Sequence, residues 1–245
     1  MCTVSIFAQK SGLTITMNRD EQRTRSEAIK PHHTADYFFP IDSQSGGTWC
    51  GLHQTGYVLT LLNRYEPGVP YLGSESRGLI IPELLAMKKI AEISSFFKTP
   101  NLYRFNPFDL LLIDPQTITH FSWNGQHCTC IKMNSKDAPF FYTSSSERTR
   151  EVVAHRRKIF DAFKRDFIKP TASELLHRLH SMRDAGKPRD GILVDRPKVH
   201  TKSICQISLG EDVAKIQYWP EAARAVDKTY KPIEQRFESN LALTT

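Results

Sequence analysis

Two hairpin patterns near the start of the chain limit its fold more than any other feature of the sequence. In the first, strands at 4–8 and 13–17 alternate apolar and polar residues around a turn that contains glycine. In the second, segments 47–52 and 57–63 flank a turn at Thr55-Gly56. Alternation with period two on both sides of a tight turn is typical of paired antiparallel strands. We therefore expect the chain to begin as antiparallel sheet.

The remaining patterns place helices between groups of strands. Helical patterns cover 76–97, 148–169 and a segment from Thr171, and strand patterns cover 108–113, 118–123, 127–133, 140–142, 192–194, 204–209 and 213–219. Asn124-Gly125 is the strongest turn signal, and Thr171 and Glu174 have the spacing of a helix capping box. Because no Pro/Gly/Ser-rich linker interrupts the chain, these patterns predict a single domain over 1–245, of the antiparallel α+β class.

Composition restricts the expected environment and partners. The chain carries a net charge of +7, five cysteines and no apolar run near the ~18 residues that a membrane helix needs. It does not begin with a secretory leader, so we expect a cytoplasmic protein without a transmembrane segment. Much of the positive charge falls in 148–169, on what we expect to be the solvated face of a helix. Such a face is compatible with peripheral membrane contact. No nucleic-acid partner is expected, and the oligomeric state stays open.

Cys2 is the first candidate for chemistry. If Met1 is removed, Cys2 carries a thiol and a free α-amine on one residue. The amine titrates near ~7.7 and the thiol near ~8.5, so at neutral pH the amine can accept the thiol proton. A nucleophile and its base would then share one residue. The alternative is a buried cysteine that begins a strand and packs in the core.

The first hairpin determines what lies near Cys2. Its second strand runs directly into Asn18-Arg19-Asp20-Glu21. In a tight hairpin the end of the second strand returns to the level of the start of the first. We therefore expect Arg19 and Asp20 close to Cys2.

Several short motifs occur in a fixed order along the chain. They are Met1-Cys2, Asn18-Arg19-Asp20-Glu21, Gly46-Gly47-Thr48-Trp49-x-Gly51, Leu62-Asn63, Ser76-Arg77-Gly78, Asn106-x-Phe108 and a weaker Thr201-Lys202-Ser203. With these motifs the chain resembles the NRDE family, also called the transport and Golgi organisation 2 family. That family looks related to the N-terminal nucleophile hydrolases, which include penicillin V acylases and bile-salt hydrolases. The resemblance implies a four-layer αββα sandwich of two antiparallel sheets covered by helices.

The resemblance and the chemistry of the residues assign catalytic roles to four positions. Cys2 would attack an amide carbonyl, and the permanent cation of Arg19 would stabilise its thiolate. Asp20 would accept a hydrogen bond from the α-ammonium, and the amide of Asn63 would donate to an oxyanion. Each of the last three has a structural alternative, namely an ion pair for Arg19, a strand-end cap for Asp20 and a turn for Asn63.

Four further residues are expected to contact the ligand. They are Asn18, Glu21, Trp49 and Lys202. Core packing explains Trp49 equally well. Two positions depart from the acylase-like pattern: segment 144–146 lacks an expected oxyanion asparagine, and Lys202 stands where an arginine is expected.

Two functions follow from this constellation. The first is an N-terminal-cysteine hydrolase of a linear amide or a related acyl bond, which requires no cofactor. The second is a non-catalytic carrier of haem or of an acyl-CoA-like lipid on an inherited hydrolase scaffold. In both, the partner is a small molecule. We expect no metal site at His127-Cys128-Thr129-Cys130, because no second Cys/His pair of matching spacing occurs. His177 and His180 are expected on a solvated helix face.

Overall fold

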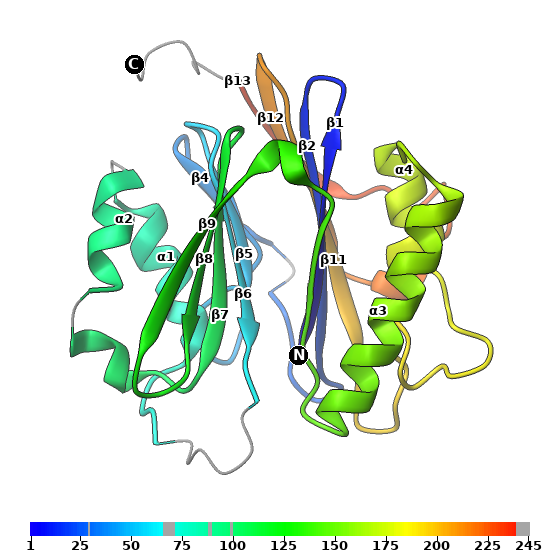
Figure 1. The fold of residues 1–245 in the computed structure, drawn as a ribbon, viewed down its shortest axis with the longest axis horizontal. Coiled ribbons are helices and arrows are strands. Elements are labelled where there is room, and N and C mark those ends of the chain that lie inside the picture. The colour runs from blue at the N-terminus through cyan, green and yellow to red at the C-terminus, as the bar shows by residue number, and fades with distance from the viewer. Residues whose placement is uncertain (29, 66–71, 88–89, 99, 239–245) are drawn as a thin grey trace.

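The protein is a layered sandwich in which two antiparallel sheets lie face to face and helices cover both outer faces (Figure 1). The computed structural model describes residues 1–28, 30–65, 72–87, 90–98 and 100–238. The order of layers is helix, sheet, sheet, helix. This arrangement confirms the predicted four-layer αββα fold of the α+β class.

One sheet unites the two ends of the chain. Its strand order is β10-β1-β2-β11-β12-β13. The strands are β1 (Cys2–Gln9), β2 (Gly12–Gln22), β10 (Phe140–Thr143), β11 (Val199–Leu209), β12 (Val213–Trp219) and β13 (Ile233–Glu238). The β1–β2 turn requires glycine, because Gly12 has a φ of +122° and a Cβ there would lie 1.7 Å from the carbonyl oxygen of Leu209.

The second sheet is a meander built from the middle of the chain, in the order β3 to β9. Its strands are β3 (His32–His33), β4 (Tyr37–Phe39), β5 (Cys50–His53), β6 (Val58–Asn63), β7 (Phe108–Ile113), β8 (Thr117–Trp123) and β9 (Cys128–Asn134). Since β9 forms one edge of this sheet, Cys128 and Cys130 lie on an edge strand.

The helical segments are short, apart from α3. They are η1 (Arg77–Leu79), α1 (Ile80–Leu85), α2 (Ile90–Phe96), η2 (Pro100–Arg104), η3 (Ser135–Asp137), α3 (Thr149–Asp166), α4 (Ala172–Glu174), η4 (Leu175–His180) and η5 (Ala222–Arg224). α1 and α2 cover the seven-stranded sheet, and α3 and α4 cover the six-stranded sheet (Figure 1). No helix in the described parts of the chain is long and apolar enough to cross a membrane.

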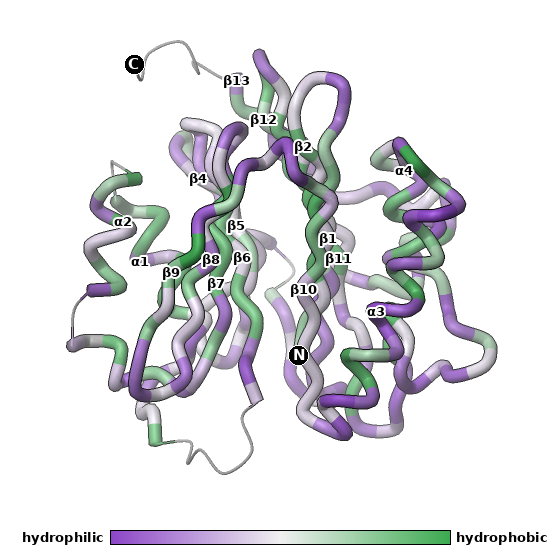
Figure 2. The backbone as a smooth tube through the Cα atoms, in the orientation of Figure 1, coloured by the Kyte–Doolittle hydropathy of each residue, from purple (hydrophilic) through white to green (hydrophobic). Residues whose placement is uncertain are grey.

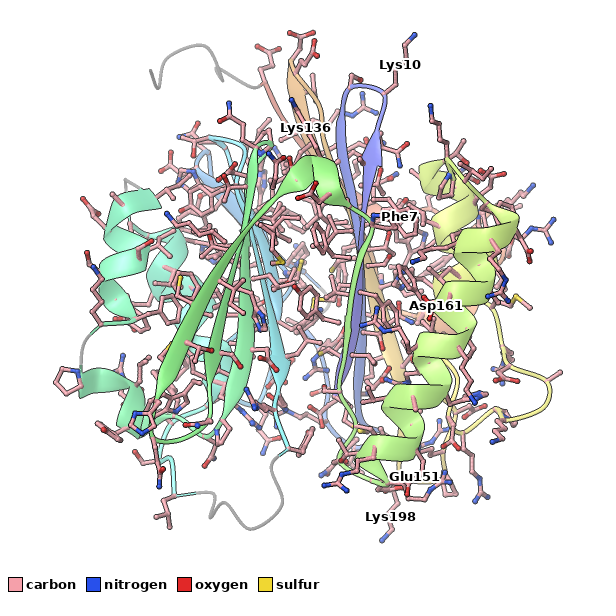
Figure 3. All side chains as sticks on the ribbon, viewed as in Figure 1. Phe7, Lys10, Lys136, Glu151, Asp161 and Lys198 are labelled. Carbon is pink, nitrogen blue, oxygen red and sulfur yellow. The ribbon has the colours of Figure 1, made fainter. Side chains whose placement is uncertain are left out.

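Successive side chains of β1 enter two different cores. Val4 and Ile6 lie in the apolar core between the sheets, whereas Phe7 packs on Phe160 of α3 with ring centroids 5.7 Å apart. Figure 3 shows Phe7 between β1 and α3. In Figure 2 hydrophobic residues recur along the strands of both sheets. Because both faces of the six-stranded sheet are covered, its central strands are buried on both sides.

Two predictions of local structure need correction, and three strands were not predicted. The 192–194 pattern is buried but forms no strand, and the described part of 76–97 is divided among η1, α1 and α2. Strands β3, β4 and β13 were not predicted, since two of them are too short to show a pattern and the third is largely polar. The capping box at Thr171 is confirmed.

Two residues that were expected on solvated helix faces instead lie on the inner face of the helical layer. Arg156 of α3 and His180 at the end of η4 are fully buried, not solvated. Arg156 lies four residues after Val152 and four before Phe160, so all three share the face that packs on the sheet. The buried position of Arg156 matters for the site described next.

Candidate functional site

The N-terminus lies at the end of β1, between the two sheets (Figure 1). In the β1–β2 register Cys2 is opposite Arg19, as the hairpin pattern predicted. The ammonium group of Met1 donates to the carbonyl oxygen of Asp20 at 2.9 Å, and the Asp20 amide donates to the Met1 carbonyl at 2.8 Å. Met1 therefore extends the β1 strand by one further residue.

A polar pocket of about 240 Å³ opens beside Cys2. Its walls are formed by Met1, Cys2, Arg19, Asp20, Glu21, Arg25, Asp42, Ser45, Thr48, Trp49, Leu61, Asn63, Glu75, Ser76, Arg77, Gly78 and Asn106. Seven of these seventeen residues are charged. The pocket thus joins the expected residues Cys2, Arg19, Asp20, Glu21, Trp49 and Asn63. Such a wall suits a small hydrophilic ligand better than a long apolar chain.

Arg19 is held rigidly at the base of this pocket. Its guanidinium is buried and pairs with Glu27 at 2.8 Å and with Asp42. It also lies over the ring of Trp49, 4.4 Å from the ring centroid. The carboxylates and the ring fix the orientation of the cation, because a guanidinium forms bidentate and stacking contacts. Arg19 therefore forms the ion pair that was its structural alternative, and it also lies beside Cys2.

The two carboxylates that hold Arg19 have different environments. Burial raises the pKa of Glu27, although Arg19 and the hydroxyls of Tyr218 and Ser203 oppose this shift. For Asp42, burial also acts to raise the pKa, but hydrogen bonds from Arg25 and Ser45 and the nearby guanidinium charges leave it below its ordinary value.

The thiol of Cys2 is protonated at neutral pH when Met1 is present. Burial raises its pKa to about 11. The N-terminal ammonium and Arg19 act in the opposite direction, while Asp20 and Glu21 add to the rise. A thiol with this pKa is a poor nucleophile, because the thiolate is the reactive form.

The side chain of Asp20 faces away from the pocket, toward the helical layer. One carboxylate oxygen accepts from Arg156 at 3.2 Å and the other from the hydroxyl of Thr201 at 2.7 Å. In the chain with Met1, the ammonium group is bound by the backbone carbonyl of Asp20, not by its carboxylate. Asp20 therefore stands next to the N-terminus through its backbone.

Arg156 and Ser144 lie behind the N-terminus. Arg156 was expected on a solvated helix face, and segment 144–146 was noted only for lacking an asparagine. The Cys2 amide donates to the hydroxyl of Ser144 at 3.2 Å. Arg156 donates to the Thr3 and Thr143 hydroxyls at 2.9 and 2.8 Å and to the Ser144 carbonyl at 3.3 Å. The four-residue spacing on α3 could have revealed Arg156, whereas only the family resemblance pointed to the segment that contains Ser144.

Two expected ligand contacts lie outside the pocket and need correction. Asn18 has the opposite strand parity from Arg19, so its side chain faces the helical layer and donates to the carbonyls of His180 and Ile192 at 2.9 and 3.1 Å. Lys202 lies at a bulge in β11 and donates to the Arg23 carbonyl at 3.2 Å. The bulge turns the neighbouring Thr201 toward Asp20 instead.

Asn63 lies where the sequence placed it, at the end of β6 and on the rim of the pocket. Its side-chain amide nitrogen donates to the Tyr65 hydroxyl at 3.4 Å. Gly47 packs on Gly78, which lines the pocket, so closely that a Cβ on Gly47 would lie 2.5 Å from the Gly78 carbonyl carbon. Only glycine permits this backbone approach, which explains the Gly46-Gly47-Thr48-Trp49 and Ser76-Arg77-Gly78 motifs structurally.

A solved amidase structure shares the fold. A Caenorhabditis elegans N-acylethanolamine-hydrolyzing acid amidase ortholog is similar over 97% of this chain and 99% of its own, with 13% identity and a TM-score of 0.56. A C2A mutant of the conjugated bile acid hydrolase from Clostridium perfringens aligns over 98% of both chains, with 10% identity and a TM-score of 0.49. At these identities the likeness concerns the fold alone.

Sequence comparison identifies the family. A comparison with curated protein sequences found no significant match. The family model described as Transport and Golgi organisation 2 matches residues 1–215. This match includes Cys2, Arg19, Asp20 and Asn63, and it agrees with the motifs of the sequence. The chain belongs to the transport and Golgi organisation 2 family, on a fold that N-terminal nucleophile hydrolases share.

Proposed function

We propose that the protein is an N-terminal cysteine amidohydrolase that cleaves the C–N bond of a small hydrophilic amide once Met1 has been removed. The observation that carries the proposal is the position of Cys2, which lines a polar pocket opposite the buried cation of Arg19. Loss of Met1 would place the α-amine on Cys2 and admit water to its thiol. Both changes favour proton transfer from sulfur to nitrogen.

The proposed reaction uses Cys2 as nucleophile and base. The α-amine accepts the thiol proton, and the sulfur attacks the amide carbonyl carbon. The ammonium then returns this proton to the leaving nitrogen, the C–N bond breaks, and a thioester and a free amine form. Water, which gives a proton to the same amine, attacks the thioester. The sulfur leaves and regains that proton, and a carboxylic acid is released.

Other pocket residues would stabilise charge during this sequence. Arg19 is positioned by Glu27, Asp42 and Trp49 and would favour the thiolate. The amide of Asn63 would donate to the oxyanion of the tetrahedral intermediate after turning from Tyr65. The hydroxyl of Ser144, already bonded to the Cys2 nitrogen, would orient the α-amine.

Intact mass and thiol labelling test the state of the N-terminus. We expect purified protein to lack Met1, and iodoacetamide at neutral pH to alkylate Cys2 before any other cysteine. Exposure alone predicts the opposite order, because Cys130 is exposed and Cys2 is buried in the chain with Met1. Retention of Met1, or labelling of Cys130 first, would contradict the proposal.

Hydrolysis of a panel of short hydrophilic amides tests the activity. We expect Cys2→Ser and Cys2→Ala each to lower kcat/KM by roughly a thousandfold or more. Cys130→Ser is the matched control, because that thiol lies on the edge strand β9 outside the pocket, and it should leave the rate unchanged. Equal activity of the Cys2 variants and the unmodified protein would reject a role for Cys2.

A carrier is the second candidate, favoured by the raised pKa of Cys2 in a chain that keeps Met1. The polar pocket does not suit haem or a long fatty-acyl chain. A more apolar groove of about 530 Å³ lies between α3 and segment 178–186 and includes Phe163, Phe167 and Leu179. Saturable binding of haemin or palmitoyl-CoA, weakened by Phe167→Ser but not by Cys2→Ala, would support this candidate. Absence of saturable binding would remove it.

A further inference from the structure

Met1 fills an enclosed space next to the backbone nitrogen of Cys2. The residue is only 6% exposed. Its ammonium group is bound to the Asp20 carbonyl, and its sulfur lies 3.2 Å from the Ser146 hydroxyl and 3.9 Å from Nη1 of Arg196. Removal of Met1 would therefore open a chamber that is continuous with the polar pocket, since Met1 is part of the pocket wall.

The leaving group of an amide substrate has to lie in this chamber. In the proposed reaction the α-ammonium of Cys2 gives a proton to the leaving nitrogen, and such a transfer requires a heavy-atom distance of about 2.6–3.2 Å. In the chain with Met1, the group attached to the Cys2 nitrogen is Met1 itself. The amine part of the substrate would replace it, while the acyl part would remain on the thiol side of the strand.

A buried guanidinium with capacity for a further anion faces this chamber. The side chain of Arg196 is 6% exposed. Its Nε donates to the Arg189 carbonyl at 2.7 Å, and Nη2 lies 3.4 Å from the Ser145 hydroxyl. The contacts of Nη1, to Glu147 at 3.5 Å and to the Met1 sulfur, are longer than the 2.7–2.9 Å typical of a charge-assisted hydrogen bond.

The acidic neighbours of Arg196 are mainly occupied elsewhere. Asp190 is 3.8 Å from Arg196 but binds Arg148 with both oxygens at 2.6 and 2.7 Å. The side chain of Glu147 is 64% exposed, so solvent screens its charge. A cation this deeply buried is stabilised by an anion with good geometry.

We propose that the substrate is an N-acyl amino acid, with the carboxylate of its leaving amine bound by Arg196 and by the hydroxyl of Ser146, which donates to the Met1 sulfur while Met1 is present. This proposal rests on the proposed hydrolase function. Cleavage would transfer the acyl group to the sulfur of Cys2 and release a free amino acid from the chamber, and hydrolysis of the thioester would then release the acyl group as an acid. Met1, where it is retained, would block this subsite.

Binding of a matched pair of ligands tests the subsite without requiring turnover. The probes are N-acetylglycine and N-acetylglycinamide, which differ in charge but hardly in size. Calorimetry would use Cys2→Ala protein shown by intact mass to lack Met1. We expect N-acetylglycine to bind roughly tenfold to a hundredfold more tightly than the amide, as expected for an arginine–carboxylate pair. Protein from cells with inhibited methionine aminopeptidase, which keeps Met1, should bind neither.

Variants of Arg196 identify the residue responsible. Arg196→Gln should remove the preference for the carboxylate, and Arg196→Lys should restore part of it, because lysine keeps the charge without the fork. Arg189→Gln is the matched control, since its exposed side chain lies on the same loop and only its carbonyl contacts Arg196. If Arg196→Gln does not fold, Ser146→Ala, at an exposed position, should weaken N-acetylglycine binding a few-fold with no effect on the amide.

The outcomes separate this inference from the proposed function. Arg196-dependent binding of N-acetylglycine by a protein that hydrolyses no amide would support the anion subsite and reject the hydrolase. Hydrolysis with no preference between N-acyl amino acids and their amides, or equal binding of both probes, would overturn the subsite and leave the hydrolase in place.

Discussion

A single buried guanidinium connects three strands behind the N-terminus. Arg156 forms an ion pair with Asp20, and both side chains are fully buried. Burial lowers the pKa of Arg156, while the charge of Asp20 opposes that shift. Because removing one partner of a buried pair leaves the other charge uncompensated, this contact controls stability and the geometry of the N-terminus together.

The Arg156–Asp20 pair predicts a large effect from one substitution. Arg156→Met should lower the free energy of unfolding by about 3–5 kcal/mol, measured by urea denaturation at pH 7. Adding Asp20→Asn to this variant should recover part of the loss, since the unpaired charge is then removed. Arg157→Met, one residue further and exposed, serves as the control. Similar stability of the Arg156 and Arg157 variants would show that the buried pair is not formed.

His180 predicts how stability depends on pH. It is fully buried between Asn18 and Ser5 at 2.8 and 2.7 Å, and burial lowers its pKa from 6.5 to about 3. Between about pH 6.5 and pH 3, His180 binds a proton in the unfolded chain but not in the folded chain. The free energy of unfolding should therefore fall by about 2 kcal/mol from pH 7 to pH 5 through this residue.

Urea denaturation at several pH values checks the His180 prediction. The variant His180→Gln should be less stable at pH 7 but should show a flatter pH dependence down to pH 5. His177→Gln, at a partly exposed position three residues earlier, should flatten the curve less than His180→Gln, although burial also lowers the pKa of His177. Parallel curves for the His180 variant and the unmodified protein would mean that His180 titrates equally in both states.

At the scale of elements, the capping box that the sequence predicted at the start of α4 is present in the structure. The Thr171 hydroxyl accepts from the Glu174 amide at 3.2 Å, and the Glu174 carboxylate accepts from the Thr171 amide at 2.7 Å. These bonds satisfy amide groups that the first turn of a helix leaves free. The helix continues as the wider turns of η4, which carry His180 to the sheet.

The capping box predicts a modest, local loss of stability. Thr171→Ala should cost about 1 kcal/mol in chemical denaturation, because one hydrogen-bonding partner of the helix start is lost. Thr171→Ser keeps the hydroxyl and should remain close to the unmodified protein. A serine variant as unstable as the alanine variant would assign the effect to the threonine methyl group instead.

At the scale of the molecule, the two sheets share one apolar core, and the order of strands in each sheet determines which strands are protected. β2 and β11 are central in one sheet and β6 is central in the other, whereas β3, β9, β10 and β13 form edges. We expect amide hydrogen exchange to be slowest in β2, β6 and β11, because central strands open only in the largest unfolding events. Faster exchange in β2 than in β13 would contradict this topology.

Local patterns in the sequence account for much of the fold and part of the site. The first hairpin predicted that Arg19 lies beside Cys2, since the pairing of neighbouring strands depends on a short turn alone. Asn18 was misplaced by the same local reasoning, because the strand period sends alternate side chains to opposite faces and only packing decides which face lines a pocket. Lys202 was misplaced because a bulge shifts the register of β11.

By itself the sequence determined the antiparallel strands, the helix capping box and the family, because these depend on neighbouring residues and on motifs in a fixed order. Only the tertiary structure decided that Arg156, Ser144 and Arg196 surround the N-terminus. These residues come from α3, from the segment after β10 and from the loop before β11, and each is distant from Cys2 in sequence. Long-range packing of sheets and helices brings them together, and no local period in the sequence encodes it.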